Sequence, residues 1–127
     1  MFRVLIALFF LLLLFPSCKK ANYKNGEFFV ENKCSFIVEV YATKTVLYKG
    51  EPHSESYYAK VNPAEIVLVN KAELKDDFEI RQYFSKINIY KGDLNSRVDG
   101  LIKSNWTEKL LGDEDVQYTL SVGDDSF

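Results

Sequence analysis

Beyond residue 26, apolar residues recur at every second position, and this period constrains the fold more than any other feature of the chain. The clearest stretches are residues 36–41, 78–84, 86–90 and 118–122. A period of two is typical of a β-strand with one face toward a core, whereas an α-helix needs a period near 3.6. The sequence therefore predicts an all-β domain.

Turn signals divide this region into short pieces. Asn62-Pro63, Lys91-Gly92-Asp93 and Asp99-Gly100 separate about seven strands at spacings near ten residues, which predicts an antiparallel β-sandwich or barrel. Residues 66–69 form a continuous apolar run, expected to be a strand buried on both faces. Residues 101–111 are the one plausible short helix, and residues 64–74 are a weaker candidate.

The chain begins with a single charge, Arg3, followed by twelve apolar residues at 4–15. As a helix this run spans about 18 Å, too short for a hydrocarbon core of about 30 Å, and Pro16 interrupts it. A basic start before a short apolar run is typical of a secretory signal. We expect residues 1–17 to be a removed signal peptide, which leaves one domain of about 110 residues.

No small-x-small cleavage pattern follows the apolar run, which ends in Leu14-Phe15-Pro16-Ser17-Cys18. This ending resembles the signal of bacterial lipoproteins, in which a small residue precedes a cysteine that receives a diacylglycerol and becomes the mature N-terminus. The resemblance covers residues 1–18 and implies lipidation of Cys18, although Phe15 stands where a leucine is usual. Lys19 follows the cysteine where an aspartate would retain such a protein in the inner membrane, so the resemblance implies the outer membrane.

Residues 18–26 are polar and short, and we expect them to tether a single β-sandwich at 27–127 to the membrane. Lys19 and Lys20 would lie at the headgroups, where each contributes about 1 kcal/mol beside an anionic surface. The alternative for Cys18 is a disulfide with Cys34, the only other cysteine, closing a loop of about 15 residues. If Cys18 is lipidated, Cys34 is expected to be a small buried hydrophobe, with a reactive thiol as the second interpretation.

Candidate chemistry is sparse. The only histidine, His53, follows a proline in a polar stretch and is expected in a solvated loop. Zinc needs three or four convergent ligands, and calcium prefers a spaced acidic loop that is missing here. The acidic clusters at 76–77, 113–115 and 124–125 are expected to be solvated turns. We nominate no catalytic, metal or cofactor-binding residue, and a charge of −2 without a basic stripe argues against nucleic acid.

Tyrosines are the most suggestive side chains. The alternation places Tyr41, Tyr83 and Tyr90 on the face opposite the main apolar set, as an exposed aromatic surface for a glycan or peptide. Cross-strand packing explains such tyrosines without a ligand, and from the sequence alone it is the favoured interpretation. Both interpretations stay open at this point.

The chain ends in a Tyr118-Thr119-Leu120 strand that is followed by an acidic tip at Asp124-Asp125. In this feature the mature chain resembles short, lipid-anchored, β-rich envelope proteins of Gram-negative bacteria, many with an immunoglobulin-like sandwich. The resemblance implies an immunoglobulin-like antiparallel sandwich without an assigned activity. We expect a non-enzymatic binding or structural role toward an envelope protein or glycan. The alternatives are a small inhibitor or immunity protein acting on an enzyme at the membrane, or a small hydrolase.

Overall fold

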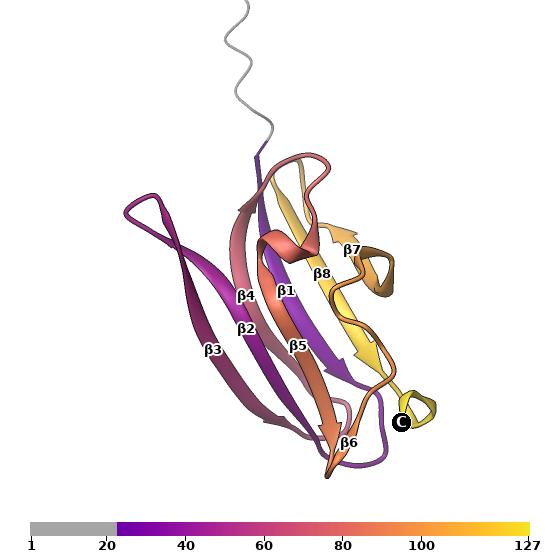
Figure 1. Ribbon diagram of the computed structural model, residues 1–127. Helices are drawn as coiled ribbons and strands as arrows, with labels where there is room; N and C mark the ends of the chain where they lie inside the picture. Colours follow the sequence, from indigo (N-terminus) through magenta and orange to yellow (C-terminus); the bar gives the residue numbers. More distant parts are fainter. Residues whose placement is uncertain (1–22) are drawn as a thin grey trace, which may run out of the picture.

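The computed structural model describes residues 23–127, which form two four-stranded sheets packed face to face (Figure 1). One sheet has the order β4-β1-β8-β7 and the other β3-β2-β5-β6. The strands are β1 (Lys24–Asn32), β2 (Val38–Tyr48), β3 (Glu51–Val61), β4 (Ile66–Leu74), β5 (Phe84–Lys91), β6 (Leu94–Asn95), β7 (Trp106–Leu110) and β8 (Asp115–Val122). The only helical elements of this part are 3-10 turns, η1 (Ile80–Gln82), η2 (Lys103–Asn105) and η3 (Asp124–Ser126). The prediction of an all-β sandwich is confirmed.

All strand pairs but one are antiparallel: β1 pairs with β4, β2 pairs with β5, and the β2–β3 hairpin extends the second sheet. The exception is β8, which lies between β1 and β7 and runs parallel to β1. An antiparallel meander cannot make that pair, so the chain crosses from β6 to the far edge of the other sheet before it returns as β8.

Aromatic packing fills the space between the sheets. Phe28 on β1 is fully buried, and five other rings lie within 5.3 to 6.1 Å of its centroid: Phe78, Tyr83, Phe84, Trp106 and Tyr118. The indole of Trp106 also donates a 2.8 Å hydrogen bond to the carbonyl of Gly100. A Cβ on Gly100 would lie 2.9 Å from two carbons of Ile87, so only glycine allows this close approach.

Two helix predictions are wrong. Residues 101–111 form the turn η2 and strand β7, because Trp106 enters the core while Thr107 to Leu110 stay exposed along the sheet edge. Residues 64–74 contain β4. That strand is also not buried on both faces: Ile66 and Leu68 are exposed while Val69 is buried, since β4 is an edge strand with one solvated face.

The stretch 78–84 was expected to be a strand from its alternation, and this is also wrong. Residues 80–82 form η1, and the strand β5 begins only at Phe84. Phe78 and Ile80 are nevertheless buried, so the alternation reports burial in an irregular segment. His53, expected in a loop, lies within β3 opposite Val46 and is exposed.

The β2–β3 ribbon continues beyond the sandwich. β2 pairs with β5 only as far as Lys44, but its pairing with β3 continues to Tyr48 opposite Glu51. Residues 45–54 therefore project as a two-stranded arm (Figure 1). Lys49 and Gly50 close the arm with φ of 51° and 80°, as a two-residue type I′ turn requires.

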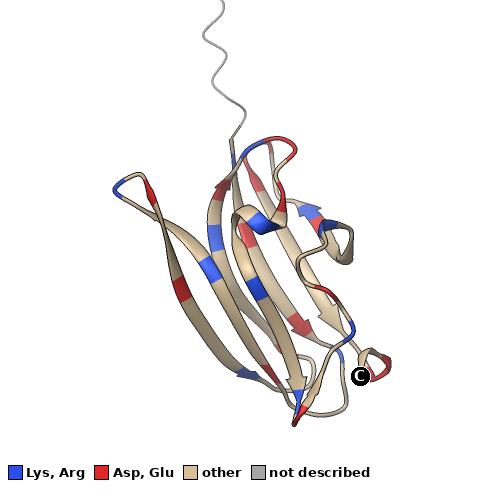
Figure 2. Ribbon diagram, viewed as in Figure 1, with Lys and Arg blue, Asp and Glu red and all other residues tan. Residues whose placement is uncertain are grey.

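The signal peptide at 1–17 and the lipidation at Cys18 lie outside the described residues. β1 begins at Lys24, so the last three residues of the segment 18–26 belong to the first strand. Within residues 23–127, no helix has the length and hydropathy needed to cross a membrane. Basic and acidic residues are interspersed over both sheets (Figure 2).

Candidate ligand-binding face

Three tyrosines form a row across the outer face of the second sheet, and we call Tyr41, Tyr58 and Tyr90 the tyrosine face. The ring of Tyr41 on β2 lies 4.8 Å from that of Tyr58 on β3 and 5.6 Å from that of Tyr90 on β5. Tyr41 and Tyr58 are 42% and 49% exposed. Val40 and Ala42, the chain neighbours of Tyr41, enter the core, so the alternation of β2 directs Tyr41 outward.

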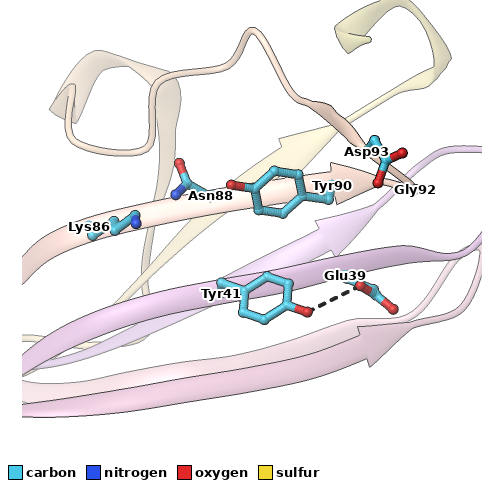
Figure 3. Close-up of a pocket in the computed structure, with 7 residues that line it drawn as sticks. All are labelled: Glu39, Tyr41, Lys86, Asn88, Tyr90, Gly92 and Asp93. Atoms are coloured by element: carbon cyan, nitrogen blue, oxygen red, sulfur yellow. Dashed lines mark hydrogen bonds between the residues drawn. The ribbon is translucent and has the colours of Figure 1, made fainter.

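Glu39 lies beside this row, on the same outward face of β2 as Tyr41 (Figure 3). Its carboxylate accepts hydrogen bonds from Tyr41 Oη at 3.3 Å and from Tyr58 Oη at 3.2 Å. Partial removal from water, followed by the charge of Glu39, raises the pKa of both phenols. Both hydroxyls therefore stay protonated at neutral pH, and each retains lone pairs that can accept a hydrogen bond from a ligand.

Beside Tyr41 the face opens into a hollow of 490 Å³ between β2 and β5 (Figure 3). Its lining adds Lys86, Asn88, Gly92 and Asp93 to Glu39, Tyr41 and Tyr90. The amide of Asn88 accepts a 3.2 Å hydrogen bond from Asn95 on β6, which positions it at the rim. The hollow thus presents aromatic rings together with amide, ammonium and carboxylate groups. Such a lining suits a ligand with both apolar ring faces and many hydroxyls.

Tyr83, predicted on the same face, lies elsewhere. It ends the turn η1 with its ring 5.8 Å from Phe28 and its hydroxyl on the Glu73 carbonyl at 2.9 Å. Tyr58 takes its place in the row, because the β2–β3 register sets it directly opposite Tyr41. The sequence reveals each strand's alternation but not the register that joins Tyr58, Tyr41 and Glu39.

Cys34 is 4% exposed, with its Sγ 3.6 Å from the carbonyl of Val122. Burial, followed by the charge of Asp124, raises the pKa of the thiol, which disfavours the reactive thiolate. Cys34 lies just beyond the far end of β1, and β1 is about 26 Å long. The six residues from Cys18 to Lys24 reach about 22 Å at most, so a disulfide between Cys18 and Cys34 would need this segment to run back along β1 almost fully extended. The geometry weighs against that bridge.

The acidic clusters occupy both ends of the sandwich. Residues 76–77 and 113–115 lie at the end where β1 begins, and Asp124 at the other end caps Ser35, accepting from its backbone N at 2.8 Å. A pocket of 160 Å³ brings Asp76, Asp77 and Glu108 into one lining with lysines and Tyr118. Among residues 23–127, no three His, Cys, Asp or Glu side chains converge as a metal site. The hydrolase alternative stays a prediction.

Comparison of the chain with protein-family models, curated proteins and solved structures finds no match.

Proposed function

We propose that this protein is a lipid-anchored envelope protein without enzymatic activity, which binds a glycan strand on its tyrosine face. The observation that carries the proposal is the row of three touching tyrosine rings, two of whose hydroxyls bond to Glu39. Two strand spacings make this row about 10 Å long, enough for more than one sugar ring. The expected anchor is an acyl-modified Cys18.

A glycan fits this face better than a protein does. Sugar rings combine an apolar C–H face, which packs on an aromatic ring, with hydroxyls that need donors and acceptors. The hollow supplies donors and acceptors through Glu39, Asn88 and Asp93. They surround the rings of Tyr41 and Tyr90. A protein partner usually inserts aromatic or aliphatic anchors into apolar pockets, and this lining is mostly polar.

The ligand prediction is tested by titrating the full chain, purified in detergent, with soluble fragments of bacterial cell-wall glycan and measuring heat of binding. Tyr41→Ala should weaken binding at least tenfold, or about 1.4 kcal/mol, because Tyr41 contacts both other rings. The matched control is Tyr48→Ala, an exposed tyrosine on the arm. Equal glycan affinity in the unmodified protein and both variants would contradict the site. If the protein binds no glycan but captures an enzyme from envelope extracts, the inhibitor alternative is favoured.

The anchor is tested by the intact mass of the membrane-extracted protein. We expect the mass of residues 18–127 plus acyl groups, and a Cys18→Ser variant should leave the membrane fraction. Retention of residues 1–17, or an unmodified Cys18, would contradict the lipoprotein interpretation.

A further inference from the structure

Four exposed apolar side chains lie at the end of the sandwich where β1 begins, whereas Ile37, Ile66 and Leu94 are exposed at the opposite end. Leu47 and Tyr48 on the arm are 77% and 62% exposed, and Leu110 and Leu111 at the end of β7 are 58% and 48% exposed. We call these four residues the apolar tips. They come from separate hairpins, so no single loop explains their exposure.

Both hairpins lie at the end where the described chain begins. The backbone N–H of Asn25 donates a 2.7 Å hydrogen bond to the carbonyl of Glu114, the last residue of the β7–β8 turn. The base of the arm shares a groove with residues 71–73 of β4, and these pair with the first residues of β1. Figure 1 shows both turns at the end where the chain enters the sandwich.

The sequence that precedes Tyr23 indicates what covers this end of the sandwich. The apolar run at 4–15 and Cys18 precede Tyr23, so a membrane attachment at either feature reaches the sandwich from this side. From Cys18 to Tyr23 the chain spans at most about 18 Å. An anchor this short holds the apolar tips close to the bilayer.

We propose that the apolar tips rest on the lipid bilayer, so that the sandwich stands on its arm and on the β7–β8 hairpin. The inference rests on the proposed membrane anchor. Leucine and tyrosine at hairpin tips suit the boundary between headgroups and acyl chains, where tyrosine keeps its hydroxyl in water. Charges of both signs occupy this end, including Lys49 in the turn of the arm, Asp76 after β4 and Glu114 before β8, so the contact is apolar and does not depend on anionic lipid.

This posture leaves the tyrosine face accessible. Tyr41 lies six residues along β2 from Leu47, which places it about 20 Å from the tip. Because the strands run away from the bilayer, the face looks sideways into the envelope space. A glycan layer parallel to the membrane could then reach it.

The test places a fluorophore that reports water exposure on a cysteine at position 47 (Leu47→Cys) in the full lipidated chain, reconstituted in phosphatidylcholine vesicles. Its emission should shift to shorter wavelength when the protein binds the vesicles. Nitroxide-labelled lipids in the vesicles should quench this emission, and neither the shift nor the quenching should depend on salt. The matched control is Leu94→Cys, an equally labelled exposed leucine of β6 at the opposite end. A second label at Leu110→Cys tests the other hairpin independently.

The outcomes separate the two proposals. Quenching at positions 47 and 110 but not at 94 supports the docked posture. If the protein floats with vesicles but the labels at positions 47 and 110 are as exposed to water as the label at position 94, this inference is overturned and the anchor is left intact. Protein that does not float with vesicles overturns both.

Discussion

The two halves of the β2–β3 ribbon share one hairpin and one alternation, yet only one half is covered. In the supported half, residues 38–44 pair with β3 and residues 39–44 also pair with β5, and Val38, Val40 and Ala42 lie in the core. In the arm, the same face continues through Val46 and Tyr48 without a sheet beneath most of it. Side-chain pattern alone therefore does not decide burial; the length of the neighbouring strand does.

A bulge marks the change. The β2–β5 register shifts between Thr43 and Lys44, where Lys44 pairs with Phe84, the first residue of β5. The turn η1 precedes Phe84 and directs the chain away, so no partner strand continues along the arm. A two-stranded ribbon is marginally stable in water by itself, and one that extends this far invites a partner for its exposed side chains.

The largest effect is expected beneath the supported half. Phe28→Ala removes the ring that five other aromatic rings surround, and should lower the free energy of unfolding by about 3 to 5 kcal/mol. Chemical denaturation of the purified protein measures this loss. Leu47→Ala in the arm is the control and should change stability by less than about 0.5 kcal/mol. Comparable losses in both variants would mean that the arm is part of the core.

Alkaline pH should act on the same core. Burial, followed by the charge of Glu108, raises the pKa of Tyr118 to about 12. Because the folded pKa exceeds the unfolded value of about 10, this tyrosine stabilises the fold fully below pH 10, and the contribution disappears as pH rises toward 12. The loss should reach about 2 to 3 kcal/mol. Denaturation at pH 9 and pH 12 measures it, and Tyr118→Phe should show a smaller loss over that window.

Part of the sandwich was predictable from sequence. The period of two in residues 36–41 and 118–122 predicts strands because each inward position meets a core. The alternation fails at 78–84 for a physical reason: Phe78 and Ile80 fill the space around Phe28 from an irregular segment, so burial produces the pattern without a strand. Residues 101–111 mislead similarly, since their apolar residues are spaced loosely as on one face of a helix, although Trp106 is the one among them that is buried.

The candidate site was predictable only in part. Alternation places Tyr41 and Tyr90 outward, but the contact with Tyr58 depends on the register between β2 and β3, which the turn at Lys49 and Gly50 sets. The buried Asn32 shows the same limit. It donates to the carbonyls of Phe36 and Val61 at 2.8 and 2.9 Å, and it accepts from the Cys34 backbone N–H, an arrangement that no sequence pattern indicates.

A pair of valines on one face of β2 compares the two halves most directly. Val40 is fully buried and Val46 is half-buried, six residues further along. Val40→Ala should cost about 2 kcal/mol of unfolding free energy, because the sandwich cannot close over the cavity, and Val46→Ala should cost less than about 1 kcal/mol. Denaturation of both variants in the same buffer measures the difference. Equal costs would show that the groove beside β4 supports the arm as firmly as the sandwich supports Val40.

The smallest effect belongs to the turn of the arm. Lys49 adopts a φ of 51°, which asparagine tolerates better than lysine at the first position of a type I′ turn. Lys49→Asn should stabilise the closed ribbon by about 0.5 kcal/mol and slow amide hydrogen exchange in residues 45–54 about twofold, with global stability unchanged. Gly50→Ala should act oppositely, because φ is 80° there and nothing else lies within 4 Å of an added Cβ. If both variants shift global unfolding and arm exchange together, the arm opens only with the whole domain, and the distinction between the two halves fails.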